Sequence, residues 1–250
     1  MPRPVIRARP VWKASLRRST RLLREFGHEQ TDPARFYSAI ARDSVGQLSQ
    51  YVDLGGQLFL DVGGGPGYFR EAFVGAGATY LALDADAGEL AGLGDVAQGT
   101  VIGSGMNLPF RDESIDICYS SNVLEHVPAP WQMAQEMVRV TRPRGTVFIS
   151  YTAWYGPWGG HETAPWHFFG GMRARRRYAR THGHEPKNKY GESLFAVTVR
   201  DGLRWAATQA DAEVVAIVPR YNPAWTYWLL KVPAVREVVT WNLVLILRKK

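Results

Sequence analysis

The sequence predicts an α/β protein built on a parallel sheet, with a ligand held at the carboxyl edge of that sheet. Residues 58–61 form an apolar run that ends in Asp61 and is followed by a glycine-rich turn over residues 63–67. Residues 80–84 form a second apolar run, which ends in Asp84. Buried strands that end in tight turns place a nucleotide-like ligand over their carboxyl ends. The glycines alone are equally compatible with an ordinary strand-to-helix turn.

The glycines that follow the first apolar run alternate with other residues. Glycine is needed where the backbone takes a positive φ or where a ligand must approach the main chain closely. A carboxylate at Asp84 is placed to accept hydrogen bonds from the two hydroxyls of a ribose. We expect the next helix to begin at Pro66. The full spacing is Asp61-x-Gly63-x-Gly65-x-Gly67.

This spacing resembles the first motif of class I S-adenosylmethionine-dependent methyltransferases, whose loop wraps the methionine part of the cofactor. Further motifs follow over residues 58–150 and resemble the type 11 group of that family, and the arginine and tryptophan usage suggests an actinobacterial member. The resemblance implies a Rossmann-like, seven-stranded sheet with helices on both faces, S-adenosylmethionine as cofactor and S-adenosylhomocysteine as product. It implies these cofactor-binding residues: Asp61, Gly63, Gly64, Gly65, Gly67, Asp84, Ala85, Ser104, Gly105, Met106, Ser120, Asn122 and Tyr37.

The third and fourth motifs resemble those of the family, with one departure. The loop over residues 104–110 would hold the adenine. Many relatives carry an aspartate at the position of Ser104, so a hydroxyl or a backbone carbonyl would replace its contact with the adenine amine. Residues 114–127 predict a fourth strand that brings Ser120 and Asn122 to the cofactor edge. Further strands are expected at residues 100–103, 146–150, 213–218 and 242–247.

Charge is unevenly distributed along the 250 residues, whose net charge is +7. The first 24 residues hold eight basic residues and no acidic one, whereas the rest holds 22 basic and 23 acidic residues. We therefore divide the chain into a basic N-terminal segment with a helix over residues 1–30 and a single domain over residues 31–250. Residues 58–150 form the cofactor-binding core of that domain.

Apolar residues in the N-terminal segment recur at helical spacing, at Trp12, Leu16, Leu23 and Phe26. Three interpretations are open: a helix packed on the body with a solvated basic face, a helix on a membrane surface, and a nucleic-acid-binding segment. We favour the first. No recognised nucleic-acid motif supports the third, so we expect no nucleic-acid partner.

The compartment is inferred from cysteine usage and hydropathy. Cys118 is the one cysteine, so no disulfide can form within the chain, which fits a reducing compartment. No apolar run approaches the roughly 20 residues of a membrane span, and no secretory signal is recognised. We expect a cytoplasmic protein, with peripheral contact to the inner face of the membrane left open.

A second helix is predicted to begin at Pro33, capped by Asp32, and to run to about Val52. In the methyltransferases that the chain resembles, a helix before the first strand commonly covers the cofactor. Phe36 and Tyr37 lie on this helix and would line that cover, although core packing explains either residue alone.

Residues 151–195 do not fit a plain alternation of strand and helix, and we expect them to form a substrate lid. Tryptophans alternate there with glycines, and the insertion follows the fifth strand at the cofactor edge of the sheet. Residues 173–189 hold seven basic residues and one acidic residue, Glu185. A lid of that charge would favour an anionic substrate. The alternative is a solvated, arginine-rich helix.

A second, aromatic insertion lies between the sixth and seventh strands. It contains Trp225, Tyr227, Trp228 and Trp241, which is too aromatic for a solvated loop. It would pack on the lid, form a dimer surface or rest at a membrane interface. The oligomeric state is left open, with a dimer among the alternatives.

Histidine is the natural base for methylation of a hydroxyl at neutral pH. His161 and His167 lie in the expected lid, and we assign them as candidate catalytic bases, His161 first. Together with Glu162 they match no recognised metal signature, so no metal ligands are assigned. We interpret the Glu125-His126 pair as structural or cofactor-side.

We expect an enzyme that methylates a hydroxyl on a sugar, a glycan or a lipid-linked glycan. Tryptophan rings suit the apolar faces of sugars, and the arginines suit an anionic head group. The alternatives are C- or N-methylation of a quinone-like or other small metabolite, and a protein that binds S-adenosylmethionine without catalysis.

Overall fold

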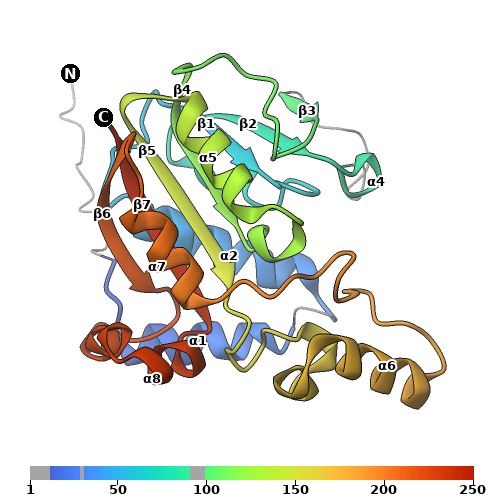
Figure 1. Ribbon diagram of the computed structural model, residues 1–250. Helices are drawn as coiled ribbons and strands as arrows, with labels where there is room; N and C mark the ends of the chain where they lie inside the picture. Colours follow the sequence, from blue (N-terminus) through green and yellow to red (C-terminus); the bar gives the residue numbers. More distant parts are fainter. Residues whose placement is uncertain (1–11, 29–30, 91–98) are drawn as a thin grey trace, which may run out of the picture.

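The computed structural model describes residues 12–28, 31–90 and 99–250. A seven-stranded sheet with the order β3-β2-β1-β4-β5-β7-β6 runs through its centre (Figure 1). This confirms the sheet predicted from the sequence. Its strands are β1 (Leu58–Val62), β2 (Thr79–Asp84), β3 (Thr100–Ile102), β4 (Ile115–Ser121), β5 (Thr141–Thr152), β6 (Ala212–Pro219) and β7 (Asn242–Lys249).

Strands β1 to β5 are parallel, whereas β7 runs antiparallel between β5 and β6. The chain first builds outward from β1 to β3 and then returns to place β4 on the other side of β1. The strand order therefore reverses between β1 and β4. In open sheets of this kind ligands bind at such a reversal, outside the carboxyl ends of the strands.

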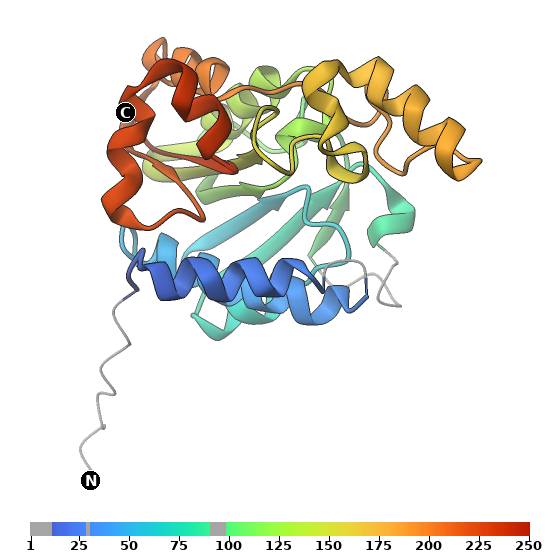
Figure 2. The ribbon, with the colours of Figure 1, turned by 90° about the horizontal axis from the view of Figure 1, so that it is seen from below.

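Helices cover both faces of the sheet, as expected (Figure 2). One face packs on α1, α2 and α3 through Leu22, Phe36 and Phe73, and the other packs on α5 and α7 through Met137 and Val199. The α-helices are α1 (Leu16–Phe26), α2 (Pro33–Leu48), α3 (Arg70–Gly75), α4 (Ala87–Leu90), α5 (Pro130–Val140), α6 (Gly171–His182), α7 (Val199–Ala207) and α8 (Pro233–Val239). Four 3-10 helices are η1 (Leu124–His126), η2 (His161–Thr163), η3 (Trp166–Phe169) and η4 (Ala224–Lys231).

Helix α1 packs on the body, as we favoured, but only part of the predicted face takes part: Phe26 packs on Phe36, with ring centroids 4.9 Å apart. Leu22 is fully buried and Arg18 is 6% exposed, whereas Leu16 and Leu23 are 58% and 42% exposed. The Arg18 guanidinium reaches Asp43 on α2, with Nε 2.8 Å from Oδ1. An ion pair thus anchors the helix where we expected leucines to do so. The basic residues 3, 7 and 9 lie outside the described residues.

Two helix boundaries differ from expectation. The helix after the glycine loop begins at Arg70 and not at Pro66. Gly65 and Gly67 take φ values of +49° and +88°, which a right-handed helix cannot contain, so the turn extends beyond the proline. Helix α2 begins at Pro33 with the Asp32 carboxylate accepting from the Arg35 amide, as predicted, but it ends at Leu48.

Both insertions lie at the carboxyl edge of the sheet, at the bottom of Figure 1. The segment after β5 forms η2, η3 and α6, and the segment after β6 forms η4 and α8. They meet where the Trp158 and Trp241 rings pack edge to face at 6.3 Å. Within the described residues, no helix has the length and apolar character to cross a membrane.

Candidate active site

Asp84 accepts a hydrogen bond from the glycine loop that connects β1 and α3. This carboxylate ends β2 and accepts the Gly65 amide at 2.9 Å and the Asp86 amide at 3.0 Å. A Cβ atom added at Gly65 or Gly67 would meet nothing within 4 Å, so the loop faces free space. At Gly63, by contrast, a Cβ would collide with Val123, so the loop packs closely on the segment after β4.

These features fit S-adenosylmethionine. The open face of the loop has room for the methionine part of the cofactor, and each Asp84 oxygen keeps a lone pair for a ribose hydroxyl. Ala85, the next residue, is exposed beside this carboxylate.

The Asp61 side chain packs against the glycine loop at Gly64. Its side chain is 3% exposed and accepts a hydrogen bond from the Tyr80 hydroxyl. A Cβ added at Gly64 would lie 3.4 Å from the Asp61 carboxyl carbon, so the carboxylate packs directly under the turn. Burial raises the pKa of Asp61 to about 7, although the hydrogen bond from Tyr80 acts in the opposite direction.

Tyr37 lies beside the glycine loop, in line with a cover formed by α2. Its ring stacks on that of Tyr68, with centroids 5.0 Å apart and an interplanar angle of 10°, and Tyr68 directly follows the loop. On its other side it packs on Phe36 at 4.9 Å. Phe36 itself is 1% exposed and belongs to the core.

The loop after β3 packs against α5 and β1. The Ser104 hydroxyl accepts the Met106 amide at 3.2 Å, and the Gln132 side chain donates to the Met106 carbonyl at 2.9 Å. A Cβ at Gly105 would lie 3.1 Å from the Met133 sulfur. Met106 packs on the core, so its contact with adenine remains a proposal.

The polar residues at the end of β4 are buried or bonded to another strand of the sheet. Ser120 is fully buried, and its hydroxyl has no partner. Asn122 takes a φ of +58°, and its Oδ1 accepts from Asn242 on β7 at 2.6 Å. Direct contact of Ser120 or Asn122 with the cofactor stays a prediction.

Arg220 is a residue that the sequence analysis missed. It follows β6, is fully buried, and donates at 2.7 Å to Ser121 on β4 and at 2.7 Å to Ser150 on β5. It also reaches Ser44 on α2. One cation thereby links the end of β6 to β4, β5 and α2. The feature of the sequence that could have identified Arg220 is an arginine directly after an apolar strand.

Glu125, His126 and His161 form a compact cluster that the sequence did not predict. One ligand atom from each residue lies within 4.8 Å of the other two. Glu125 is 1% exposed, and its Oε1 accepts the Thr152 amide at 2.9 Å. The His161 backbone takes a φ of +47°, a left-handed conformation that is uncommon outside glycine and that concentrates at functional sites.

The cluster adjoins the cofactor loop. Val123, which packs on Gly63, is followed directly by η1, the turn that carries Glu125 and His126. The His126 and His161 rings pack edge to face at 5.0 Å, so η1 and η2 meet here. Burial lowers the pKa of His161 to about 4, with the neighbouring His126 acting in the same direction, so its ring is neutral at pH 7.

His167 is not part of this cluster. Its ring is fully buried, its Nε2 lies 3.2 Å from the Gly156 carbonyl, and it packs edge to face on Trp154. A base must come within hydrogen-bond reach of the proton that it takes, so contact of His161 or His167 with an acceptor proton stays a prediction. Glu162 accepts from Asn188 at 2.9 Å and is not part of the cluster.

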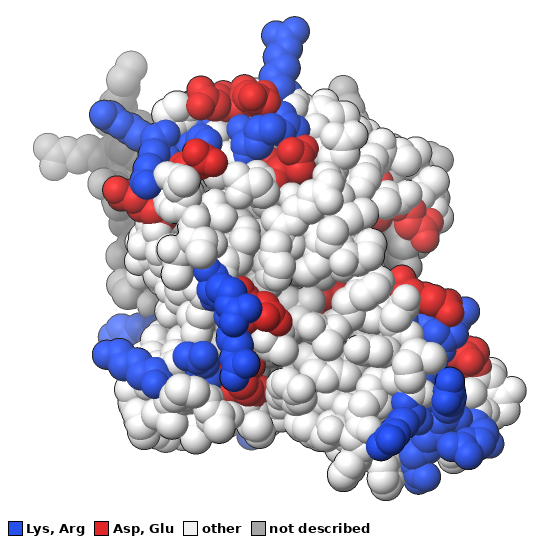
Figure 3. All heavy atoms as spheres, viewed as in Figure 1, with Lys and Arg blue, Asp and Glu red and all other residues white. Residues whose placement is uncertain are grey.

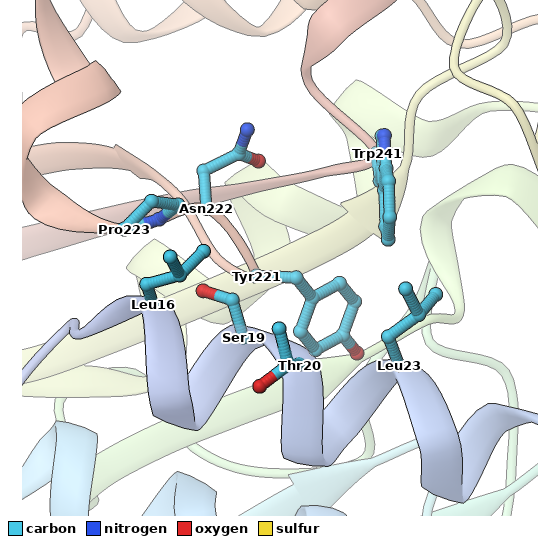
Figure 4. Close-up of a pocket in the computed structure, with 8 residues that line it drawn as sticks. All are labelled: Leu16, Ser19, Thr20, Leu23, Tyr221, Asn222, Pro223 and Trp241. Carbon is cyan, nitrogen blue, oxygen red and sulfur yellow. The ribbon is translucent and has the colours of Figure 1, made fainter.

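An apolar groove of about 190 Å³ opens between α1 and the start of the aromatic insertion (Figure 4). Leu16 and Leu23 of α1 form one wall, and Tyr221, Pro223 and Trp241 form the other. Trp241 packs on Trp158, whose carbonyl accepts the His161 amide at 2.9 Å. One wall residue of the groove therefore contacts the segment that carries His161.

Helix α6 projects from the body and carries a basic surface (Figure 3). Its exposed arginines are Arg173, Arg176, Arg177 and Arg180. We call these residues, together with the exposed Trp166, Phe168, Phe169 and Met172, the α6 surface. The Arg177 guanidinium lies 3.9 Å from the Trp166 ring centroid, so cationic and aromatic groups are interleaved.

Comparisons with known proteins agree with the fold and the glycine loop. Residues 60–149 match the model of the Methyltransferase domain family Methyltransf_11. A protein of Mycobacteroides abscessus described as an uncharacterized methyltransferase is 51% identical over 251 residues, covering 95% of this chain and 96% of its own. One from Mycobacterium avium is 52% identical over 246 residues, covering 94% and 96%.

Solved structures share the fold at low identity. An S-adenosylmethionine-dependent methyltransferase from Mesorhizobium loti gives a TM-score of 0.57 at 17% identity, covering 84% of this chain and 98% of its own. A Haloferax volcanii complex of the Trm112 methyltransferase activator with a methyltransferase gives 0.55 at 16% identity, covering 92% and 96%. The chain belongs to the class I S-adenosylmethionine-dependent methyltransferases, as a member of the Methyltransf_11 family with mycobacterial relatives.

Proposed function

We propose that this methyltransferase acts on a hydroxyl of a sugar, within a glycan or a lipid-linked glycan, with the help of His161. S-adenosylmethionine supplies an electrophilic methyl group when bound. The observation that carries the proposal is the cluster of Glu125, His126 and His161 beside the glycine loop. A hydroxyl needs help in losing its proton, whereas many carbon and nitrogen acceptors do not. A buried polar cluster at this edge supplies that help.

The chain's own residues would divide the work. Asp84 and the loop at 63–67 would bind and orient the cofactor. Ser104 and Met106 would border its adenine, and Tyr37 would cover it. The segment from η2 to α6 would close over the acceptor and exclude water, which strengthens every polar interaction inside the site.

The acceptor class is inferred from the two insertions. Exposed Trp158 and Trp166 offer flat rings for the apolar faces of a sugar. The α6 surface would attract an anionic group, and the groove beside α1 would take an apolar portion. We therefore favour an anionic or lipid-linked glycan, used in the cytoplasm by a protein in peripheral contact with the inner face of the membrane.

The experiment is a kinetic comparison of His161→Ala with His182→Ala, which removes an exposed histidine from α6. Groups that assist proton removal typically contribute 100- to 10,000-fold, so kcat of His161→Ala should fall by about that factor while cofactor affinity stays unchanged. His182→Ala should keep its turnover. Full turnover by His161→Ala, or a product methylated on carbon or nitrogen, would contradict the proposal.

A further inference from the structure

We propose that Glu125, His126 and His161 bind a divalent metal ion at the carboxyl edge of the sheet. The three residues come from two separate segments, η1 after β4 and η2 after β5, and their ligand atoms lie within 4.8 Å of one another. The binding site stands on this geometry. Only the use of the ion, on an acceptor hydroxyl, rests on the function proposed above.

Two of the three residues carry a buried polar atom that could serve as a ligand atom. Among the described residues, Oε2 of Glu125 and Nε2 of His161 have no hydrogen-bond partner, and the Glu125 side chain is almost fully buried. A buried polar atom without a hydrogen bond destabilises the folded protein, and such atoms in native proteins need an explanation. A bound cation would satisfy both atoms at once. A bound water is the competing explanation.

The remaining contacts orient the cluster for a cation. Nδ1 of His126 lies 2.7 Å from the Ser193 carbonyl, which only accepts, so Nδ1 carries the proton and Nε2 presents its lone pair. Metal-ligating histidines usually donate their other ring N–H in this way. Oε1 of Glu125 is held by the Thr152 amide, which leaves Oε2 as the free oxygen.

The donor set also indicates the kind of ion. Two imidazoles and one carboxylate suit first-row transition ions such as Mn²⁺, Fe²⁺, Co²⁺ and Zn²⁺ better than Mg²⁺ or Ca²⁺. Ligand bonds of about 2.0–2.2 Å require the three atoms to lie roughly 3–3.5 Å apart, so a small inward movement of η2 would complete the site.

Three protein ligands leave coordination positions open, as catalytic metal sites do. An acceptor hydroxyl that entered one of these positions would have its pKa lowered by the cation, and its proton would leave to solvent before the segment from η2 to α6 closed over the acceptor. In this way His161 would help the acceptor lose its proton by holding the ion rather than by taking the proton itself.

The test is calorimetric titration of untagged, chelator-treated protein with Mn²⁺ and, separately, with Co²⁺, in the absence of cofactor and acceptor. We expect one site per chain, and a Co²⁺ visible spectrum that shows nitrogen ligands. Glu125→Gln and His161→Ala should each weaken binding at least tenfold. His182→Ala should bind as the native protein does, and circular dichroism checks that each variant is folded.

Three results would overturn the metal site: no binding by the folded native protein up to millimolar ion, binding unchanged in both cluster variants, or a Co²⁺ spectrum without nitrogen ligands. The two proposals fail separately. Ion binding with a product methylated on nitrogen or carbon keeps the metal site and rejects the hydroxyl acceptor. An O-methylated product without ion binding keeps the hydroxyl acceptor and rejects the metal site.

Discussion

Asp84 links the second strand of the sheet to the glycine loop, and its carboxylate has two tasks. It accepts a hydrogen bond from the Gly65 amide, and we propose that it also accepts hydrogen bonds from the ribose hydroxyls of the cofactor. Asp84→Ala should therefore raise the dissociation constant for S-adenosylmethionine by about tenfold to a hundredfold, since a hydrogen bond to a charged group contributes about 1.5–3 kcal/mol. Calorimetry on the folded variant measures this directly.

Two further variants serve as an intermediate case and as a control for Asp84→Ala. Asp84→Asn keeps one acceptor oxygen and should lie between the native protein and Asp84→Ala. Asp53→Ala removes an exposed acid before β1 that accepts only a local amide at 3.2 Å, and it should leave affinity unchanged. Native affinity in folded Asp84→Ala would remove Asp84 from the cofactor site.

Asp61 makes stability depend on pH. Its pKa is about 7 in the folded protein against an ordinary value of 3.8, so the folded state holds a proton that the unfolded state releases. The free energy of unfolding should therefore fall as pH rises from about 4 to about 7, and this contribution should be constant above that range.

The Asp61→Asn variant tests that dependence. An amide keeps the oxygen that accepts from Tyr80 and carries no charge. Between pH 5 and pH 8, urea titrations of the cofactor-free proteins should show the free energy of unfolding of the variant rising by about 2.5 kcal/mol relative to that of the native protein. Parallel pH profiles for the two proteins would show that the Asp61 pKa is not raised.

Residue roles were predictable where a motif fixes both spacing and chemistry. The glycine spacing and the strand-ending Asp84 carry their own physical reasons, and the structure places them together. The cluster at Glu125, His126 and His161 was not predictable, because 35 residues separate His126 from His161 and only the fold joins them. His161 alone was identified, on its residue type.

At the scale of elements, the docking of α1 depends on a buried ion pair. The side chains of Arg18 and Asp43 are 5% and 3% exposed, and Arg18 also donates to the Arg220 carbonyl at 2.8 Å. Pairs of this kind are costly to break, because the remaining partner stays buried and unbalanced. The α1 wall of the apolar groove therefore depends on this contact.

Arg18→Met should destabilise the protein by about 3–5 kcal/mol in urea unfolding, because it leaves Asp43 buried without its main partner. The double variant with Asp43→Leu should recover most of that loss. Arg17→Met, at an exposed position one residue away, serves as the control and should change stability by less than about 0.5 kcal/mol. If Arg18→Met, the double variant and Arg17→Met all unfold at the same free energy as the native protein, the pair does not anchor α1.

Element positions were largely predictable, and their packing faces less so. Alternation and apolar runs predicted all seven strands within a few residues, because the parallel core leaves little choice of residue type. The face of α1 was predicted only in part. Phe26 packs on the core, but Leu16 and Leu23 stay exposed, because helical periodicity cannot show that a buried acid on α2 pairs with Arg18.

On the scale of the whole molecule, the α6 surface and the apolar groove both lie at the edge that holds the cofactor loop. If lipid-linked glycans are the acceptors, this edge should bind vesicles that contain anionic phospholipid. Phe169→Ser, which removes a side chain 68% exposed on that surface, should reduce vesicle cosedimentation several-fold. Glu213→Gln on β6 is a control away from the surface, and equal binding by all proteins would reject the contact.

The architecture followed from the sequence, but the acceptor chemistry did not. Local apolar patterns indicate the strands of the sheet, whose order reverses between β1 and β4. The segment after β5 and the aromatic insertion have no repeating pattern, so the sequence could not show their contact through Trp158 and Trp241.

The central claim is that a hydroxyl oxygen receives the methyl group. The direct measurement supplies the native protein with S-adenosylmethionine carrying a ¹³C-labelled methyl group, together with a glycolipid extract, and locates the label in the product by NMR. We expect a ¹³C methyl group bonded to an oxygen of a sugar in the product of the native protein. His161→Ala should form much less of this labelled product. A label bonded to nitrogen or carbon, or equal labelling by the two proteins, would contradict it.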